Sequence, residues 1–212
     1  MKTGILWDLD GTLLDTLADL TDALNYALAQ FGYPSRTMEE VRRFIGNGAR
    51  RLITLSIPEG AEVDPVLAVY KDYYDAHCQI KTKPYDGVLE ALAVLGKKYP
   101  MAVVSNKPDS AVKPLCAQYF PQLFARGESA DCPRKPAPDM LFRAMEEIGV
   151  EKCVYVGDSE VDVITAKAAG APCLSVLWGF RDREEIEAKG GQHFCDAPAE
   201  LVEKLEELIN GK

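Results

Sequence analysis

The sequence has little positive charge, and this excludes several classes of partner. Its 212 residues include 24 Lys and Arg against 33 Asp and Glu, which gives a formal net charge of −9. General nucleic-acid binding needs a basic footprint, and anionic membranes attract basic residues, so we expect neither partner. Charge alone also predicts poor binding of phosphorylated molecules, an inference that local charges at a site can reverse.

Long apolar runs and a secretory leader are missing as well. No stretch approaches the roughly 18 apolar residues of a membrane span. Asp8, Asp10 and Asp15 interrupt the N-terminal segment where a signal peptide needs an uninterrupted apolar run. The six cysteines include no C-x-x-C pair, and an even number suggests disulfides only in short secreted chains. We therefore expect a cytoplasmic protein with free thiols.

Several common catalytic motifs are absent. The chain has no G-x-x-x-x-G-K-[ST] or G-x-G-x-x-G loop for nucleotide phosphates and no G-x-S-x-G elbow. No cysteine is followed six positions later by arginine, as in the usual cysteine-phosphatase loop. With only His77 and His193, a histidine-rich zinc site or a histidine-driven triad is disfavoured. Carboxylates therefore remain as the candidate catalytic groups.

Short apolar runs alternate with helical patterns over most of the chain. The runs are Thr3–Trp7, Met101–Val104, Val154–Val156 and Cys173–Leu177. Near-continuous apolar runs are typical of strands buried on both faces of a parallel sheet, and intervening helices indicate βαβ crossovers. A length of 212 residues suits one domain with a smaller insertion. The sequence predicts an α/β fold with a Rossmann-like parallel-sheet core.

One stretch breaks this alternation. Between Thr16 and about Lys83 no convincing strand occurs, and apolar residues recur at helical spacing. Helical patterns follow one another at Met38–Ile45, Ala49–Ser56 and Pro65–Gln79. We therefore predict a core made of residues 1–15 and 84–212, with an inserted all-α domain at residues 16–83.

Two aspartates stand at the end of the first predicted strand. Asp8 and Asp10 are two residues apart, so an extended chain projects both carboxylates to one side. Ligands bind at the carboxyl ends of strands in open α/β sheets, and two adjacent anions call for a cation between them. All-oxygen ligation favours Mg²⁺. Gly11 permits a tight turn, Thr12 offers a hydroxyl or a backbone N–H, and we expect both residues to contact phosphate.

The segment D-x-D-G-T-L-x-D-T at Asp8–Thr16 resembles the first motif of the haloacid-dehalogenase-like phosphohydrolases. Three later segments match the remaining motifs of that family in order, so the resemblance spans the chain. Their matching residues are Ser105 in VVSNK, Lys135 in RKPAPD, and Asp158 with Asp162 in VGDSEVD.

The resemblance implies a role for each matched residue. Asp8 is the expected nucleophile, which forms an aspartyl-phosphate, and Asp10 the expected general acid and base. The expected ligands of Mg²⁺ are Asp8, the backbone carbonyl of Asp10, and Asp158. Ser105, Asn106 and Lys135 are expected to bind the phosphate oxygens. Asp162 is expected to orient Lys135 and to support the metal site. A carboxylate at position 10 argues against the dehalogenase branch, which lacks one there.

The helical insertion resembles the cap of the phosphoglycolate phosphatase and phosphoglucomutase-like branch. Such a cap closes over the site, excludes water and selects the leaving group. The segment Phe44–Ile53 (FIGNGARRLI) resembles the cap loop of phosphoglycolate phosphatases, and WGFR (Trp178–Arg181) also resembles that branch. We expect Arg50 or Arg51 to bind a substrate carboxylate through its guanidinium group. The alternative is that both side chains face solvent.

These features predict a Mg²⁺-dependent phosphatase of a small phosphorylated metabolite, with 2-phosphoglycolate as the first candidate. Pyrophosphate, sugar phosphates and a β-phosphoglucomutase-like reaction need the same core and stay open. A phosphoacceptor receiver domain also combines strand-end acids with a Ser or Thr and a Lys. Receivers carry the acceptor aspartate on a middle strand and have no inserted helical domain. The sequence assigns no oligomeric state.

Overall fold

The computed structural model describes residues 2–211 and has a parallel sheet at its centre. Within these residues a six-stranded sheet has the order β5–β4–β1–β6–β7–β8, and every neighbouring pair is parallel. Its strands are β1 (Thr3–Trp7), β4 (Met101–Pro108), β5 (Phe124–Glu128), β6 (Lys152–Gly157), β7 (Cys173–Val176) and β8 (His193–Cys195). The predicted α/β fold with a parallel-sheet core is confirmed.

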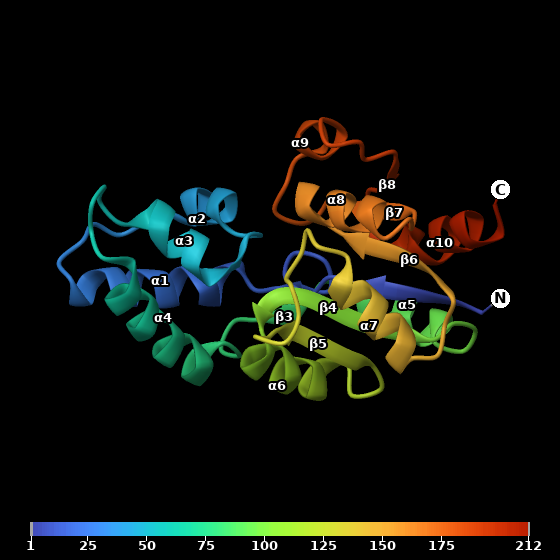
Figure 1. Cartoon of the computed structure of the whole chain (residues 1–212), viewed down its shortest axis with the longest axis horizontal. Helices are drawn as coiled ribbons and strands as arrows, with labels where there is room; N and C mark the ends of the chain where they lie inside the picture. The colour runs from blue at the N-terminus through green and yellow to red at the C-terminus, as the bar shows by residue number, and fades with distance from the viewer. Residues whose placement is uncertain (1, 212) are drawn as a thin grey trace.

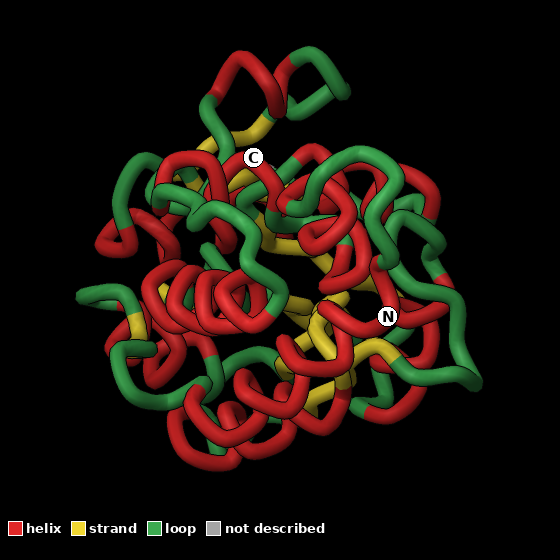
Figure 2. Tube along the Cα trace, turned by 90° about the vertical axis from the view of Figure 1, so that its left-hand side faces the viewer, coloured by secondary structure: helices red, strands yellow, loops and turns green. Residues whose placement is uncertain are grey.

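Helices cover both faces of this sheet, as Figures 1 and 2 show. One face carries α5 (Val88–Leu95), α6 (Asp109–Tyr119) and α10 (Leu201–Asn210), with the short 3₁₀ turn η1 (Pro198–Glu200) before α10. The other face carries α7 (Asp139–Glu147), α8 (Glu160–Ala168) and α9 (Arg183–Glu187).

Strand β1 divides its side chains between the two hydrophobic cores that result. Ile5 and Trp7 belong to one apolar cluster, while Leu6 belongs to the other, and all three are fully buried. Successive side chains of a strand point to opposite faces, so a continuous apolar run is the pattern that a doubly covered strand needs.

Four helices form a separate group at one side of the sheet, away from both chain ends (Figure 1). They are α1 (Leu17–Gln30), α2 (Met38–Phe44), α3 (Gly48–Ser56) and α4 (Val63–His77). The chain enters and leaves this helical segment through the antiparallel pair β2 (Leu14–Asp15) and β3 (Lys83–Pro84). The pair lies beside the domain boundaries predicted at residues 15/16 and 83/84, and the division into two domains stays a prediction.

Edge strands were not predicted from the sequence. β5 has the sequence FARGE and only one buried residue, and β8 is three residues long with one buried residue. Both pair with a neighbour on one side only. An edge strand needs neither a continuous apolar run nor strict alternation, so its sequence carries little signal.

A buried aspartate ties the two ends of the helical segment together. Asp19, in the first turn of α1, is 4% exposed. Its carboxylate accepts the backbone N–H of Lys81 at 3.0 Å and that of Thr82 at 2.8 Å. These charge-assisted hydrogen bonds hold the returning chain against the start of α1.

We predict that Asp19→Ala lowers the free energy of unfolding by about 2–3 kcal/mol, because it leaves two backbone N–H groups without their acceptor. The matched control is Asp22→Ala, which removes an exposed ion pair with Lys81 and should leave the denaturation midpoint nearly unchanged. Urea denaturation measures both variants. Equal midpoints for the two variants would contradict the assigned role of Asp19.

Candidate active site

The candidate site lies where three central strands end. β1 stands between β4 and β6, so the chain runs to opposite sides of β1, and such a switch point opens a crevice at the carboxyl ends of the strands. Asp8 directly follows β1, and Asp158 directly follows β6. Ser105 and Asn106 lie in the carboxyl-terminal half of β4. The parallel sheet thus brings together residues that are far apart in sequence.

Lys135 occupies the centre of this group. It lies on the segment between β5 and α7 and is 3% exposed. Its Nζ is 2.8 Å from Asp8 Oδ1 and 2.8 Å from Asp162 Oδ1, and it donates to the Tyr155 hydroxyl at 2.9 Å. A buried ammonium needs such partners, since an unpaired buried charge is very costly.

Burial sets the protonation of these groups. It raises the pKa of the Asp8 carboxyl from 3.8 to about 7, although the Lys135 ammonium acts in the opposite direction. Burial, with the carboxylates of Asp162 and Asp8, raises the pKa of Asp158 well above its ordinary value. Burial alone would lower the pKa of Lys135, but Asp162 and Asp8 outweigh it and raise that pKa. Lys135 is therefore an ammonium, while Asp8 and Asp158 bind a proton more readily than ordinary carboxyl groups do.

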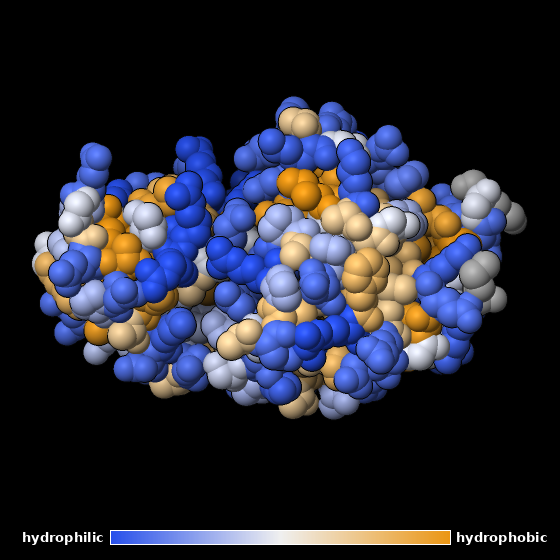
Figure 3. All heavy atoms as spheres, viewed as in Figure 1, coloured by the Kyte–Doolittle hydropathy of each residue, from blue (hydrophilic) through white to orange (hydrophobic). Residues whose placement is uncertain are grey.

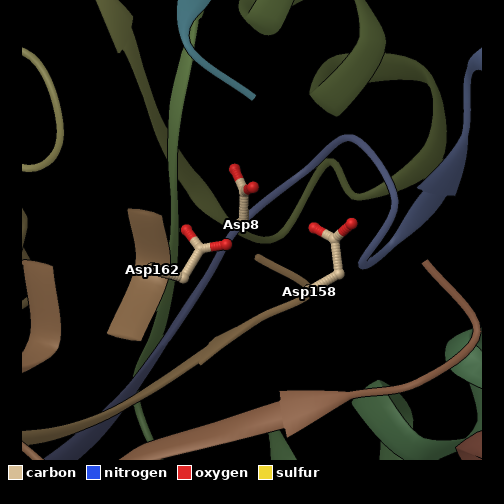
Figure 4. A group of neighbouring side chains, drawn as sticks. All are labelled: Asp8, Asp158 and Asp162. Carbon is tan, nitrogen blue, oxygen red and sulfur yellow. The ribbon is translucent and has the colours of Figure 1, made fainter. Parts of the chain in front are cut away.

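The carboxylates fit a divalent cation. One ligand oxygen each from Asp8, Asp158 and Asp162 lies within 4.8 Å of the others, and Figure 4 shows the three side chains gathered at the strand ends. Three buried carboxylates exceed the single charge of Lys135, and an all-oxygen donor set suits Mg²⁺. Asp162 already receives Lys135 on Oδ1 and the Ser159 hydroxyl on Oδ2 at 2.6 Å. Its position suits the supporting role predicted for it.

Asp10 lies beside this group with a partner that the sequence analysis missed. Lys107 Nζ is 2.6 Å from Asp10 Oδ1, and the Lys107 side chain is 4% exposed. The only signal for Lys107 was its place directly after Ser105 and Asn106 in VVSNK. The ion pair gives the Asp10 carboxylate a fixed position next to Asp8.

Asn106 holds the Lys135 loop. Its Oδ1 accepts the backbone N–H of Lys135 at 2.8 Å, and its Nδ2 donates to the Lys135 carbonyl at 2.9 Å. Its Nδ2 is also 3.4 Å from the carbonyl of Gly46 in the helical segment. The Ser105 hydroxyl, which is nearly buried, accepts the backbone N–H of Lys107 at 3.2 Å. Both side chains line the site, but the Asn106 amide is engaged in positioning Lys135.

Gly11 and Thr12 support Asp158 from the turn after β1. The Thr12 hydroxyl donates to Asp158 Oδ1 at 3.2 Å, and the Gly11 N–H donates to the Leu14 carbonyl at 2.9 Å. Gly11 has φ +80°, and a Cβ there would lie 2.3 Å from Asp158 Oδ2, so this turn needs glycine. Neither residue lines the cavity, and their predicted contact with phosphate stays a prediction.

A cavity joins these residues to the helical segment. Asp8, Asp10, Ser105 and Lys135 line its sheet side. The helical side is lined by Leu20, Ile45, Gly46, Gly48, Ala49, Leu52, Tyr70, Lys71, Tyr74 and Asp75. Hydrophilic side chains gather along the seam between the two parts on the face that Figure 3 shows. A ligand in the cavity is therefore enclosed between the strand ends and the helices.

Comparison with known proteins identifies the family of this chain. A model described as a haloacid dehalogenase-like hydrolase matches residues 5–176. The chain belongs to the haloacid dehalogenase-like hydrolases. The resemblance that the four motifs indicated is thus confirmed, and the three carboxylates and Lys135 lie where those motifs meet.

Relatives within this family indicate which kind of hydrolase the chain is. The chain is 34% identical to phosphoglycolate phosphatase 1 of Pseudomonas aeruginosa over 97% of its length and 78% of that protein. It is 35% identical to the phosphoglycolate phosphatase of Mesorhizobium japonicum, with 95% of each chain covered. A crystal structure from Lactobacillus delbrueckii subsp. bulgaricus, proposed to be a phosphoglycolate phosphatase, superposes with a TM-score of 0.91. It is 39% identical and covers 97% of this chain and 99% of its own. This haloacid dehalogenase-like hydrolase is a phosphatase.

Arg50 and Arg51 lie away from the cavity of this hydrolase. Arg50 pairs with Asp64 on the exposed side of the helical segment, and Arg51 is exposed. Neither residue lines the cavity. Their predicted contact with a substrate carboxylate stays a prediction, and the geometry gives it no support.

Two other arginines connect the helical segment to the sheet. Arg181, 6% exposed, donates to the carbonyls of Arg42 at 2.9 Å and Ile45 at 2.5 Å, and pairs with Glu160 at 3.0 Å. Arg42 pairs in return with Asp182 at 3.0 Å. Carbonyls at the end of α2 carry partial negative charge, which favours an arginine there. The two arginines hold the end of α2 over the cavity.

Within residues 2–211, no helix combines the length and the apolar character that a membrane crossing requires.

The raised pKa of Asp8 predicts a pH-dependent stability for the metal-free protein. The folded state binds this proton up to about pH 7, whereas the unfolded carboxyl releases it near its ordinary value of 3.8. Between these values the folded state holds more protons, so the contribution of Asp8 to stability falls as the pH rises.

Urea denaturation in the presence of a chelator, at about pH 5 and about pH 8, tests this linkage. The wild-type protein should lose stability relative to Asp8→Asn as the pH rises, because asparagine does not titrate. A constant stability difference between the two proteins would contradict the raised pKa.

Proposed function

We propose that the chain is a Mg²⁺-dependent phosphatase that hydrolyses a small phosphate monoester through an aspartyl-phosphate on Asp8. The supporting observation is the contact of Asp8 with the buried Lys135 ammonium, 2.8 Å away, at a cluster of carboxylates. 2-Phosphoglycolate is the first candidate substrate, since relatives 34% and 35% identical over nearly the whole chain are phosphoglycolate phosphatases.

Asp8 and Asp10 divide the chemistry between them. An Asp8 oxygen forms the bond to phosphorus while the bond from phosphorus to the ester oxygen breaks, and Asp10 donates a proton to that leaving oxygen. Asp10 then accepts a proton from the water that attacks phosphorus and releases phosphate from Asp8. The ion pair of Asp10 with Lys107 keeps the carboxylate next to Asp8.

The positive groups offset the repulsion between Asp8 and the phosphate. Lys135 lies against Asp8 and offers its ammonium to a phosphate oxygen, and Ser105 lines the same cavity. Asp8, the backbone carbonyl of Asp10 and Asp158 would hold Mg²⁺, which would supply further positive charge. Asn106 acts on this step through Lys135, whose backbone it holds.

The helical segment acts as a cap that selects the leaving group. Its residues form the far wall of the cavity, and Arg42 and Arg181 fasten it to the sheet end. A closed cavity excludes bulk water from the reacting groups. In this proposal residues 16–83 are the cap, residues 1–15 and 84–212 are the catalytic core, and the partner is a small phosphorylated metabolite.

The first test is Asp8→Asn. We expect purified variant protein to fold as the wild type does, by circular dichroism, and to release no phosphate above background, because the amide is no nucleophile. Wild-type hydrolysis of p-nitrophenyl phosphate should require added Mg²⁺ and stop with a chelator. Substantial hydrolysis by Asp8→Asn, or by wild type without any divalent cation, would contradict the mechanism.

The second test is a panel of substrates. We expect kcat/KM to be highest for 2-phosphoglycolate among small phosphate monoesters, pyrophosphate and sugar phosphates. Single Arg50→Ala and Arg51→Ala variants test the remaining sequence prediction, and the positions of both residues outside the cavity predict an unchanged preference. A panel without preference for 2-phosphoglycolate would overturn that substrate while leaving the phosphatase activity in place.

A further inference from the structure

The wall that the helical segment gives to the cavity has few groups that can recognise a leaving group. Its charged side chains are Lys71 and Asp75, which are exposed and lie one turn apart on α4 with opposite signs. Exposed charges are well solvated and contribute little to selectivity. The other polar side chains of this wall belong to Tyr70 and Tyr74.

Tyr74 carries a hydroxyl group that the protein itself does not use. The residue is 3% exposed, and its buried oxygen has no hydrogen-bond partner among the described residues. Buried hydroxyls nearly always have partners, because leaving one unpaired costs free energy. Burial and the Asp10 carboxylate raise the pKa of Tyr74 above its ordinary value, so the hydroxyl keeps its proton and is available as a donor.

Tyr74 is also placed next to the proposed acid and base. Lys107 Nζ, 2.6 Å from Asp10 Oδ1, lies 4.7 Å from the centre of the Tyr74 ring. The Tyr70 ring stacks on Tyr74 with 5.7 Å between the ring centres. Asp10, Lys107 and the two tyrosines thus form a continuous row from the strand ends to α4. Since Asp10 protonates the ester oxygen, the leaving group lies beside this row.

We propose that Tyr74 is a specificity-determining residue whose hydroxyl donates a hydrogen bond to an acceptor oxygen of the leaving group. The substrate class is a phosphate monoester of a small alcohol that carries a carboxylate close to the ester oxygen. Lys107, whose ammonium lies over the Tyr74 ring, lines the same cavity. This inference rests on the proposed phosphatase function and assigns the recognition to α4 instead of Arg50 or Arg51.

The test compares two substrates of similar shape, 2-phosphoglycolate and isobutyl phosphate, in which methyl groups replace the carboxylate oxygens. We expect Tyr74→Phe to lower kcat/KM for 2-phosphoglycolate by roughly 10- to 100-fold, the effect of losing a hydrogen bond to a charged group. For isobutyl phosphate the change should stay within about twofold, because that ester offers no acceptor at this position.

The matched control is Tyr73→Phe on the same helix. Tyr73 stacks on Tyr26 and His77 and does not line the cavity, so both substrates should react as with the wild type. Equal losses on both substrates in Tyr74→Phe would overturn the inference. A loss of selectivity in Tyr70→Phe or Lys71→Met, with Tyr74→Phe unchanged, would also overturn it. Wild-type protein that hydrolyses neither ester would instead contradict the proposed function.

Thermal unfolding without ligand gives a readout that does not depend on activity. Removing a buried hydroxyl that has no partner should leave the Tm of Tyr74→Phe equal to or above that of the wild type. A Tm several degrees lower would show that the hydroxyl has a structural role, and would overturn the inference.

Discussion

The site depends on one buried contact, the Lys135 ammonium between the carboxylates of Asp8 and Asp162, each 2.8 Å away. A buried charge with its partner removed is strongly destabilising, so this contact fixes the strand ends as well as the chemistry. Asn106 holds the Lys135 backbone from β4, and Tyr155 meets its ammonium from β6. Three neighbouring strands thus converge on one side chain, and the buried carboxyl groups at their ends outnumber this single ammonium.

The second determinant is the way the helical segment is held over this charge. The end of α2 is fixed by Arg181, and the start of α1 is fixed to the returning chain by Asp19. The net charge of −9 did not predict a phosphatase, because bulk charge does not determine a site. In the proposed mechanism, phosphate is selected by cations placed locally among buried acids, and the leaving group is selected by the opposite, mostly apolar wall.

The central part of the fold and of the site was predictable from the sequence. Strand β1 is a continuous apolar run followed directly by Asp8, and Ser105 and Asp158 also lie near strand ends, so periodicity and motif order indicated these positions. The edge strand β5 has too little burial to leave a pattern. Lys107 and Tyr74 were missed because their importance comes from contacts across the fold. Arg50 and Arg51 lie outside the cavity, and their contact with a substrate carboxylate stays a prediction, because a basic pair in the sequence does not specify which side of its helix faces the cavity.

The central claim is that Asp8 accepts a phosphoryl group only when a divalent cation completes the buried charge cluster. Trifluoroberyllate, which imitates a phosphoryl group on an aspartate, tests this directly by ¹⁹F NMR of the 212-residue chain. We expect protein-bound fluorine signals with Mg²⁺ present, and their loss in Asp8→Asn or with a chelator. Bound signals that persist in Asp8→Asn, or that form without any divalent cation, would contradict it.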